Sequence, residues 1–157
     1  MYLQRSDTRG LSQAATRLSP TCHAAPGVIV YVDTSDVREG ALEELKAGMK
    51  ELADFVEANE PRIIAYNVYL SEDGARMTVV HVHPDSDSLE YHMEVAGPVF
   101  RQFVELVTLS SIDIYGDPSE TVLTQSHEKA RLLGRDAVVV ESLHAGFTRF
   151  AVESPAQ

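Results

Sequence analysis

Three of the six histidines in this chain fall in one short stretch, HVHPDSDSLEYHMEVAG, which runs from 81 to 97. His81 and His83 are two positions apart, and His92 follows in the next expected element. Residues two apart on a strand point to the same side about 7 Å from each other, so both imidazoles can approach one ion or one substrate. The spacing favours three hypotheses: a divalent metal site, a catalytic pocket, or structural histidines whose polar atoms are satisfied in a core.

The metal hypothesis needs a third ligand beside the His-x-His pair. His92, Asp85 and Glu94 are the candidates, because imidazole nitrogen and carboxylate oxygen both bind divalent ions. No other part of the chain shows metal-ligand spacing, and the single cysteine, Cys22, rules out a thiolate cluster. A metal therefore stays an alternative, and no metal ligand is assigned.

The catalytic hypothesis requires the histidines to share a pocket with other groups that transfer protons. A hairpin predicted at 73–74 pairs Tyr66 with His81 and turns both toward the same side of the sheet. His92 lies on the apolar stripe of the helix expected to cover that side. Burial tunes the pKa values of groups that meet in an apolar cavity. The candidate catalytic residues are His81, His83, His92 and Tyr66.

The hydrophobic pattern predicts the elements that would position these residues. Alternating apolar runs and β-branched residues predict strands at 27–33, 62–70, 75–83, 108–116 and 136–143. Apolar residues at steps of three and four predict helices after the first, third and fourth of these strands. Residues 144–150 are predicted to be irregular or to form a short sixth strand. The order β-α-β-β-α-β is the ferredoxin-like pattern, here with an extra C-terminal helix and strand.

Capping residues and proline predict where the helices begin and end. Asp36 with Glu39 is expected to cap the first helix, and Asp87 with Glu90 to cap a second helix that begins near Ser88. Asp117 is expected to cap the third helix. Pro98 is expected to kink or break the second helix, because proline lacks a backbone donor and clashes with the preceding turn.

The bulk composition narrows the partners that the chain can have. It carries 13 basic and 24 acidic residues, a formal net charge of −11, whereas binding nucleic acid requires Lys and Arg to neutralise phosphates. We therefore expect no nucleic-acid partner. No apolar run approaches the roughly 20 residues that cross a bilayer, so no membrane association is expected. One cysteine allows no intrachain disulfide, which fits the reducing cytoplasm as the expected location.

The patterned part of the chain is expected to form a single domain. Residues 1–26 are rich in Ser, Thr and Ala and are predicted to be an N-terminal arm. Residues 27–157 are predicted to be one domain, with a C-terminal extension from about residue 117. A chain of 157 residues is long enough to bury a proper core in one such domain.

The stretch HVHPDSDSLEYH, on the third strand and the start of the second helix, resembles the antibiotic biosynthesis monooxygenase family of dimeric α+β barrels. Members of that family show a carboxylate, an aromatic residue two positions on, an Asp two further, and a His on the following helix. Asp85 and His92 match this pattern at the same separation. His83 stands at the aromatic position and His81 at the acidic one, so these two depart from it. The resemblance spans roughly residues 27–116.

The resemblance implies an α+β fold: a ferredoxin-like protomer whose sheet pairs with a second copy to form a homodimeric barrel. Both faces of the predicted sheet are largely apolar, which agrees with a sheet that is covered on both sides. The ligand pocket is then expected between sheet and helices, and its ligand is expected to be a small aromatic molecule. The candidate substrate-binding residues are Tyr91, Val99, Phe103 and Tyr115.

The resemblance also implies a reaction: oxygenation of an aromatic or phenolic substrate without metal or cofactor. A base takes the phenolic proton, and the electron-rich anion reacts with oxygen. Neutral imidazole suits that role near pH 7. Haem degradation is disfavoured, because members with that activity use a pocket Trp and this chain contains none.

A non-catalytic protein of the same fold is the alternative. The departures at His81 and His83 are what a barrel that binds a small metabolite, or only scaffolds, would show. Fold by itself does not choose between these functions.

Overall fold

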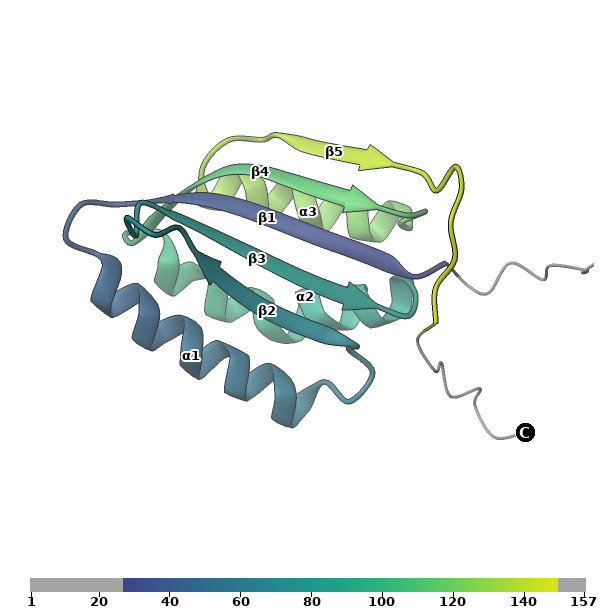
Figure 1. Cartoon of the computed structure of the whole chain (residues 1–157), viewed down its shortest axis with the longest axis horizontal. Coiled ribbons are helices and arrows are strands. Elements are labelled where there is room, and N and C mark those ends of the chain that lie inside the picture. The colour runs from purple at the N-terminus through teal and green to yellow at the C-terminus, as the bar shows by residue number, and fades with distance from the viewer. Residues whose placement is uncertain (1–26, 150–157) are drawn as a thin grey trace, which may run out of the picture.

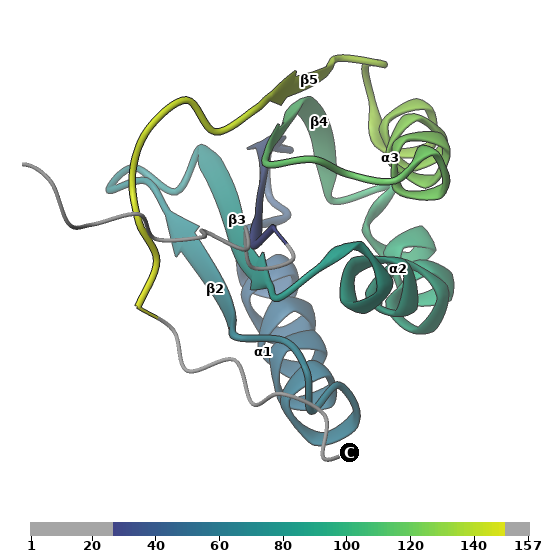
Figure 2. The same ribbon diagram turned by 90° about the vertical axis from the view of Figure 1, so that its right-hand side faces the viewer.

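In the computed structural model, which describes residues 27–149, five strands form one sheet and three helices pack on one of its faces (Figures 1 and 2). The predicted N-terminal arm, residues 1–26, lies outside the described residues. The elements are β1 (Ile29–Val37), α1 (Leu42–Asn59), β2 (Ala65–Leu70), β3 (Arg76–His83), α2 (Ser86–Phe100), a 3₁₀ turn (Arg101–Phe103), β4 (Val107–Tyr115), α3 (Glu120–Leu133) and β5 (Val138–Glu141). No helix of this part of the chain is both long and apolar enough to cross a membrane.

The strand order in the sheet is β2-β3-β1-β4-β5. β1 pairs antiparallel with β3 and β4, and β2 pairs antiparallel with β3, which is the ferredoxin-like arrangement. β5 runs parallel to β4 at the edge of the sheet, since α3 carries the chain back between them (Figure 1). The predicted ferredoxin-like protomer with an extra C-terminal helix and strand is confirmed.

The β2–β3 hairpin has the predicted register, with Tyr66 opposite His81. The reversal is longer than the predicted two-residue turn, because the ladder ends where Leu70 faces Met77. Gly74 takes a positive φ of 70° and its N–H donates to Ser71 O at 2.9 Å. The turn therefore spans residues 71–74, one residue earlier than predicted, and the pairing of Tyr66 with His81 is unchanged.

The core lies between the sheet and the helices and follows the predicted periodicities. In α1 the buried positions are Leu45, Met49, Leu52 and Val56, the apolar stripe of the sequence. In β1 burial alternates, so Ile29, Tyr31, Asp33 and Ser35 face the helices. Each large apolar side chain buried there stabilises the fold by about 1.5–3 kcal/mol. This packing fixes the three helices on one face of the sheet, with α1 next to β2, α2 next to β3 and α3 next to β4.

The caps predicted for α1 and α3 are wrong. Asp36 does not cap α1, because β1 continues to Val37 and the Asp36 carboxylate accepts a hydrogen bond from Ser110 Oγ at 3.0 Å. Asp117 does not cap α3; the N-cap is Ser119, whose Oγ accepts from the Val122 N–H. In both cases the acidic residue instead accepts a hydrogen bond from a serine of a neighbouring segment, Ser110 for Asp36 and Ser142 for Asp117.

The second helix also differs from its prediction. It begins at Ser86, and its N-cap is Asp85, which accepts from Ser88 N–H at 2.9 Å, rather than the predicted Asp87, which lies in the first turn of the helix. Pro98 does not end it, and the helix continues to Phe100. Pro98 is exposed one turn from the helix end, where it removes one hydrogen bond, while Phe100 is buried in the core. Residues 144–149 form no strand.

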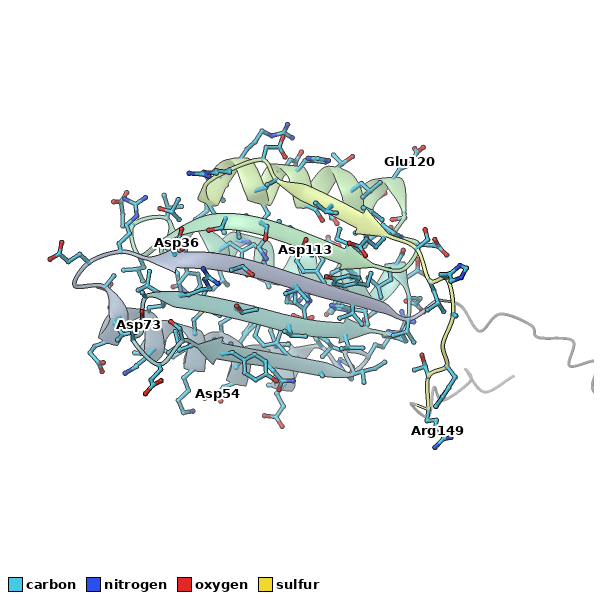
Figure 3. The ribbon with its side chains drawn as sticks, turned by 45° about the horizontal axis from the view of Figure 1, so that its top comes forward. Asp36, Asp54, Asp73, Asp113, Glu120 and Arg149 are labelled. Atoms are coloured by element: carbon cyan, nitrogen blue, oxygen red, sulfur yellow. The ribbon has the colours of Figure 1, made fainter. Side chains whose placement is uncertain are left out.

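No helix of residues 27–149 lies on the other face of the sheet (Figure 2). Its central side chains are half-buried valines, Val32 and Val80, which pair across β1 and β3. On their outer sides, Val32 is flanked by Asp113 of β4 and Val80 by Asn67 of β2. Acidic side chains such as Asp54 and Glu120 project from the outer surfaces of the helices (Figure 3). The fold therefore presents one closed, helix-covered face and one open face with an apolar centre.

Candidate functional site

The three histidines of the HVH…H stretch meet on the helix-covered face of the sheet. His81 and His83 reach it from β3 and His92 from α2, and all three are fully buried. The ring centroids of His81 and His92 are 4.7 Å apart, and those of His83 and His92 are 5.6 Å apart. We call these residues, with the tyrosines described next, the histidine cluster.

Two tyrosines complete the histidine cluster. The Tyr66 ring lies 5.6 Å from both His81 and His92. The Tyr31 ring lies 4.5 Å from His81. Sequence analysis selected Tyr66 and missed Tyr31, although the alternation of β1 places Tyr31 on the inward face. Burial raises the pKa values of both phenols, so both remain protonated at neutral pH.

A hydrogen-bonded chain runs through the two strand histidines. Ser88 Oγ is 3.0 Å from His83 Nδ1, and His83 Nε2 is 2.8 Å from His81 Nδ1. Burial, and then the neighbouring His92, lowers the pKa of His83 to about 3, and burial holds the pKa of His81 well below its ordinary value. Both rings are therefore neutral, with one N–H each. The chain of hydrogen bonds can run in either direction, which makes His81 Nε2 a donor in one state and an acceptor in the other.

His92 has a different partner, the buried carboxylate of Glu60. Glu60 follows the last residue of α1, and its Oε2 lies 2.8 Å from His92 Nδ1. A carboxylate oxygen accepts the hydrogen bond, so His92 Nδ1 is the donating nitrogen and Nε2 is the ring nitrogen that faces away from Glu60. Sequence analysis missed Glu60. Its signal was present, because Glu60 stands four positions after Val56 on the buried stripe of α1.

Three polar atoms of the histidine cluster have no hydrogen-bond partner among residues 27–149: Tyr31 Oη, His81 Nε2 and His92 Nε2. Buried polar atoms are nearly always paired, since an unpaired one costs about 1–3 kcal/mol. Two of the three are ring nitrogens that can accept a proton. The arrangement therefore retains free proton-transferring groups in a dry part of the protein.

A buried ion pair lies beside the histidine cluster. Lys129 Nζ on α3 donates to Asp33 Oδ2 on β1 at 2.7 Å, and both side chains are 7% exposed. The ammonium also lies 4.5 Å from the centroid of the Phe100 ring and 5.1 Å from that of Tyr31. Burial lowers the pKa of Lys129, but the charge and hydrogen bond of Asp33 together with Tyr31 outweigh it, and the net direction of the pKa is upward. Lys129 is therefore charged. Sequence analysis missed this pair.

Three hollows approach the histidine cluster. The outer groove, about 400 Å³, runs between α1 and β2. The end hollow, about 380 Å³, adjoins it at Ala53 and Tyr66 and includes Glu60. The inner cavity, about 30 Å³, lies between the sheet and the helices and is lined by Asp33 and Lys129. Tyr66 lines all three, so it separates the solvent-facing grooves from the interior.

The four predicted substrate-binding residues fall in different places. Phe103 is buried and lines the inner cavity, and Val99 packs half-buried against the core. Tyr91 and Tyr115 are exposed, at 48% and 42%, and line none of the three hollows. The structure thus places Phe103 at the inner cavity and leaves the two tyrosines on the protein surface.

The metal alternative finds little support in the described part of the chain. Among residues 27–149 no group of three or more His, Cys, Asp or Glu side chains is arranged to hold a metal ion. Of the candidate third ligands, Asp85 caps α2 and pairs with Arg62, and Glu94 is exposed. The His92 imidazole is engaged by Glu60.

Comparisons with known proteins establish the fold. No family model matches the sequence, and no curated protein matches it. Among solved structures, MupZ from Pseudomonas fluorescens is similar at a TM-score of 0.61 with 17% identity, over 81% of this chain and 98% of MupZ. SnoaB, a cofactor-independent oxygenase from Streptomyces nogalater, is similar at a TM-score of 0.50 with 16% identity, over 59% of this chain and 94% of SnoaB. A candidate antibiotic biosynthesis monooxygenase from Deinococcus radiodurans is similar at a TM-score of 0.50 with 14% identity, over 58% of this chain and 93% of that protein.

At these identities the likeness shows a shared fold alone. The match to MupZ covers more of the chain than residues 27–116 can supply, so it takes in part of the C-terminal extension. The other two cover a share close to that of the ferredoxin-like core. The extension is therefore an element of fold shared with at least one solved protein.

Proposed function

From a fold shared with antibiotic biosynthesis monooxygenases, we propose that this protein is a cofactor-independent oxygenase acting on a small aromatic or phenolic molecule. One observation carries the proposal. Two buried imidazole nitrogens, His81 Nε2 and His92 Nε2, have no partner and lie beside Tyr66, which forms the wall of a groove open to solvent. A proton acceptor in a dry site next to a substrate-sized groove is what this reaction requires.

His92 is the proposed general base. Glu60 holds the proton on Nδ1 and orients the ring, so the lone pair on Nε2 is available to take a proton from the substrate. The proton comes from a phenolic hydroxyl or from a methylene activated by neighbouring aromatic rings. The negative charge that results is delocalised over the substrate.

Molecular oxygen is the oxidant in the proposed reaction. The carbanion reduces O₂ and forms a C–O bond, which yields a hydroperoxide after protonation. Loss of water from the hydroperoxide then leaves a carbonyl, so that CH₂ and O₂ become C=O and H₂O. The substrate itself supplies the electrons. The protein supplies the base, a proton donor for the departing hydroxide, and a dry site.

His81 and Tyr66 are the proposed proton donors. The neutral Ser88–His83–His81 chain delivers an N–H at His81 Nε2 in one of its two directions. Burial raises the pKa of the Tyr66 phenol, and the charges of Asp33 and Glu60 add to this, so its hydroxyl stays available to donate to a developing oxyanion.

A homodimer is proposed as the functional unit. The centre of the open sheet face is apolar, with Val32 beside Val80, and no helix in the described part of the chain covers it. A second copy placed on this face would close a barrel and remove that apolar surface from water.

Oxygen uptake tests the oxygenase proposal. Wild type, His92→Ala and Glu51→Gln, an exposed position on α1, are incubated with a panel of anthrones and quinols. We expect uptake with wild type and Glu51→Gln and none above background with His92→Ala. Equal rates in all three proteins, or no uptake with any substrate, would count against the proposal.

A non-catalytic ligand-binding protein is the second candidate. The departures of His81 and His83 from the family pattern favour it, as does the position of the histidine cluster behind Tyr66. This candidate predicts that aromatic ligands raise the midpoint of thermal unfolding while no oxygen is consumed.

A further inference from the structure

The buried ion pair of Lys129 and Asp33 has no part in the proton transfers proposed above. Burying two charges costs several kcal/mol per ion before their attraction is counted, so such pairs recur where a protein needs a charge inside. Lys129 belongs to α3, in the C-terminal extension, and Asp33 to β1. The extension thus brings a positive charge to the wall of the inner cavity.

The Lys129 ammonium has more N–H donors than the hydrogen bond to Asp33 uses. Lysine carries three N–H donors, and within residues 27–149 its side-chain hydrogen bond goes to Asp33 Oδ2. The aromatic rings of Phe100 and Tyr31 also lie next to the ammonium group. The other titratable group lining the inner cavity is Tyr66, and Tyr31 faces the ammonium from β1. Asp33 is the one anion among these groups, so the remaining donors suit a second, external oxygen.

Lys129 lines two hollows: the inner cavity, and a solvent-facing hollow of about 660 Å³ between α2 and α3. Its ammonium is paired with Asp33, which lines the inner cavity and not the α2–α3 hollow, so the size of the inner cavity limits what can reach the ammonium beside Asp33. A water-sized group needs at least about 10–15 Å³ by this measure. The inner cavity of about 30 Å³ therefore holds an oxygen substituent and excludes an aromatic ring. The outer groove, at about 400 Å³, has room for the ring. The two hollows share Met49, Tyr66 and Met77, so a ligand in the groove needs to pass one oxygen between these side chains.

We propose that Lys129, held by Asp33, binds the ionised oxygen of an aromatic substrate whose ring lies in the outer groove. This inference rests on the proposed function for the site and specifies its substrate: a flat aromatic molecule with an acidic hydroxyl at one edge. The positive charge stabilises the phenolate relative to the phenol, and neutral or cationic aromatics gain nothing from it.

Binding of 4-nitrophenol tests the inference, because the phenolate and the phenol of this probe absorb at different wavelengths. For wild type we expect the ratio of phenolate to phenol in the bound probe to exceed that of free probe at the same pH by about tenfold. Lys129→Met is expected to abolish the excess. Arg131→Met removes a positive charge from the exposed side of the same helix and is expected to leave it intact.

A second variant guards against misfolding of Lys129→Met, which leaves Asp33 buried without its partner. Asp33→Asn/Lys129→Met removes both charges with little change in shape, and circular dichroism checks that it folds. This double variant is also expected to lack the phenolate excess. The inference is overturned if wild type fails to bind the probe, if bound and free probe ionise alike, or if the double variant keeps the excess.

The binding assay is independent of turnover. A phenolate excess that depends on Lys129, in a protein that consumes no oxygen, sustains the inference and defeats the oxygenase proposal. Oxygen uptake that is unchanged in the double variant, with no phenolate excess in wild type, does the reverse.

Discussion

Glu60 and His92, 32 positions apart in the chain, form a hydrogen-bonded pair in the core, with Oε2 2.8 Å from Nδ1 and side chains 2% and 1% exposed. The pair joins the end of α1 to the middle of α2. It decides which nitrogen of His92 is free, and hence what that residue can do.

Replacing Glu60 tests whether His92 acts as a base. In Glu60→Gln the amide can donate as well as accept, so the proton of His92 is no longer confined to Nδ1. We expect the oxygenation rate to fall by about a hundredfold, within the range that general-base catalysis supplies, while the protein stays folded. Oxygen uptake measures the rate, and ¹⁵N NMR of the imidazole reports the tautomer. An unchanged tautomer together with an unchanged rate would contradict the assignment.

The neutral strand histidines predict a stability that depends on pH. Burial lowers the pKa of His83 to about 3 and that of His81 well below its ordinary value, whereas the unfolded chain restores both to about 6.5. As pH falls below about 6.5, the unfolded state binds protons that the folded state does not. The free energy of unfolding should therefore decrease toward pH 3, by up to about 1.4 kcal/mol per pH unit for each histidine, and be insensitive to these groups above pH 7.

Urea unfolding at a series of pH values measures this dependence. His81→Phe/His83→Phe removes both groups and should flatten the slope between pH 4 and 6.5. His144→Gln, at an exposed position, should leave the slope as it is in wild type. A double variant with the wild-type slope would show that these histidines are protonated in the folded protein.

The ring and the hydroxyl of Tyr66 are predicted to have different roles, the ring in substrate binding and the hydroxyl in the chemical step. Tyr66→Phe keeps the ring that lines the hollows and removes the hydroxyl that donates to an oxyanion. We expect kcat to fall by about ten- to a hundredfold with KM within about twofold of wild type. Tyr66→Leu removes the ring as well and should raise KM. Steady-state kinetics of both variants distinguish the two effects, and equal losses in KM for both would argue for a packing role alone.

The open sheet face is predicted to be a dimer interface. A carboxylate introduced by Val80→Glu would be buried against a second copy and should dissociate the dimer. Ala58→Glu, at an exposed position on α1, should not. Light scattering coupled to size exclusion gives the mass of each. A monomeric wild type would contradict the prediction.

Removing only one partner of the Lys129–Asp33 ion pair is predicted to lower the free energy of unfolding more than removing both. Lys129→Met leaves the Asp33 carboxylate unpaired in the core and should lower the free energy of unfolding by about 3–5 kcal/mol. Asp33→Asn/Lys129→Met leaves no buried charge and should lose clearly less. Urea unfolding of the three proteins measures both losses; equal losses would mean that the carboxylate is not stranded in the single variant.

The register that aligns the strand histidines was predictable from local sequence. The Asp73-Gly74 reversal and the alternation of β3 placed Tyr66 opposite His81 on the inward side, as observed. The apolar stripe of the following helix brought His92 to the same side. Helix caps were harder to predict. Asp36 accepts a hydrogen bond from a serine of the neighbouring strand β4, and the local sequence does not indicate such a partner from another part of the chain.

The sequence alone determined the ferredoxin-like order of elements and the inward direction of the three histidines, since both follow from short-range periodicity. Only the tertiary structure decided the partners that give those histidines their chemistry. Glu60 meets His92 where one helix ends against another, and Asp33 meets Lys129 across 96 positions of the chain. Such contacts depend on how the helices pack on the sheet. The periodicity of side chains predicts which face of an element is buried, but it does not predict which polar group of the facing element that face will contact.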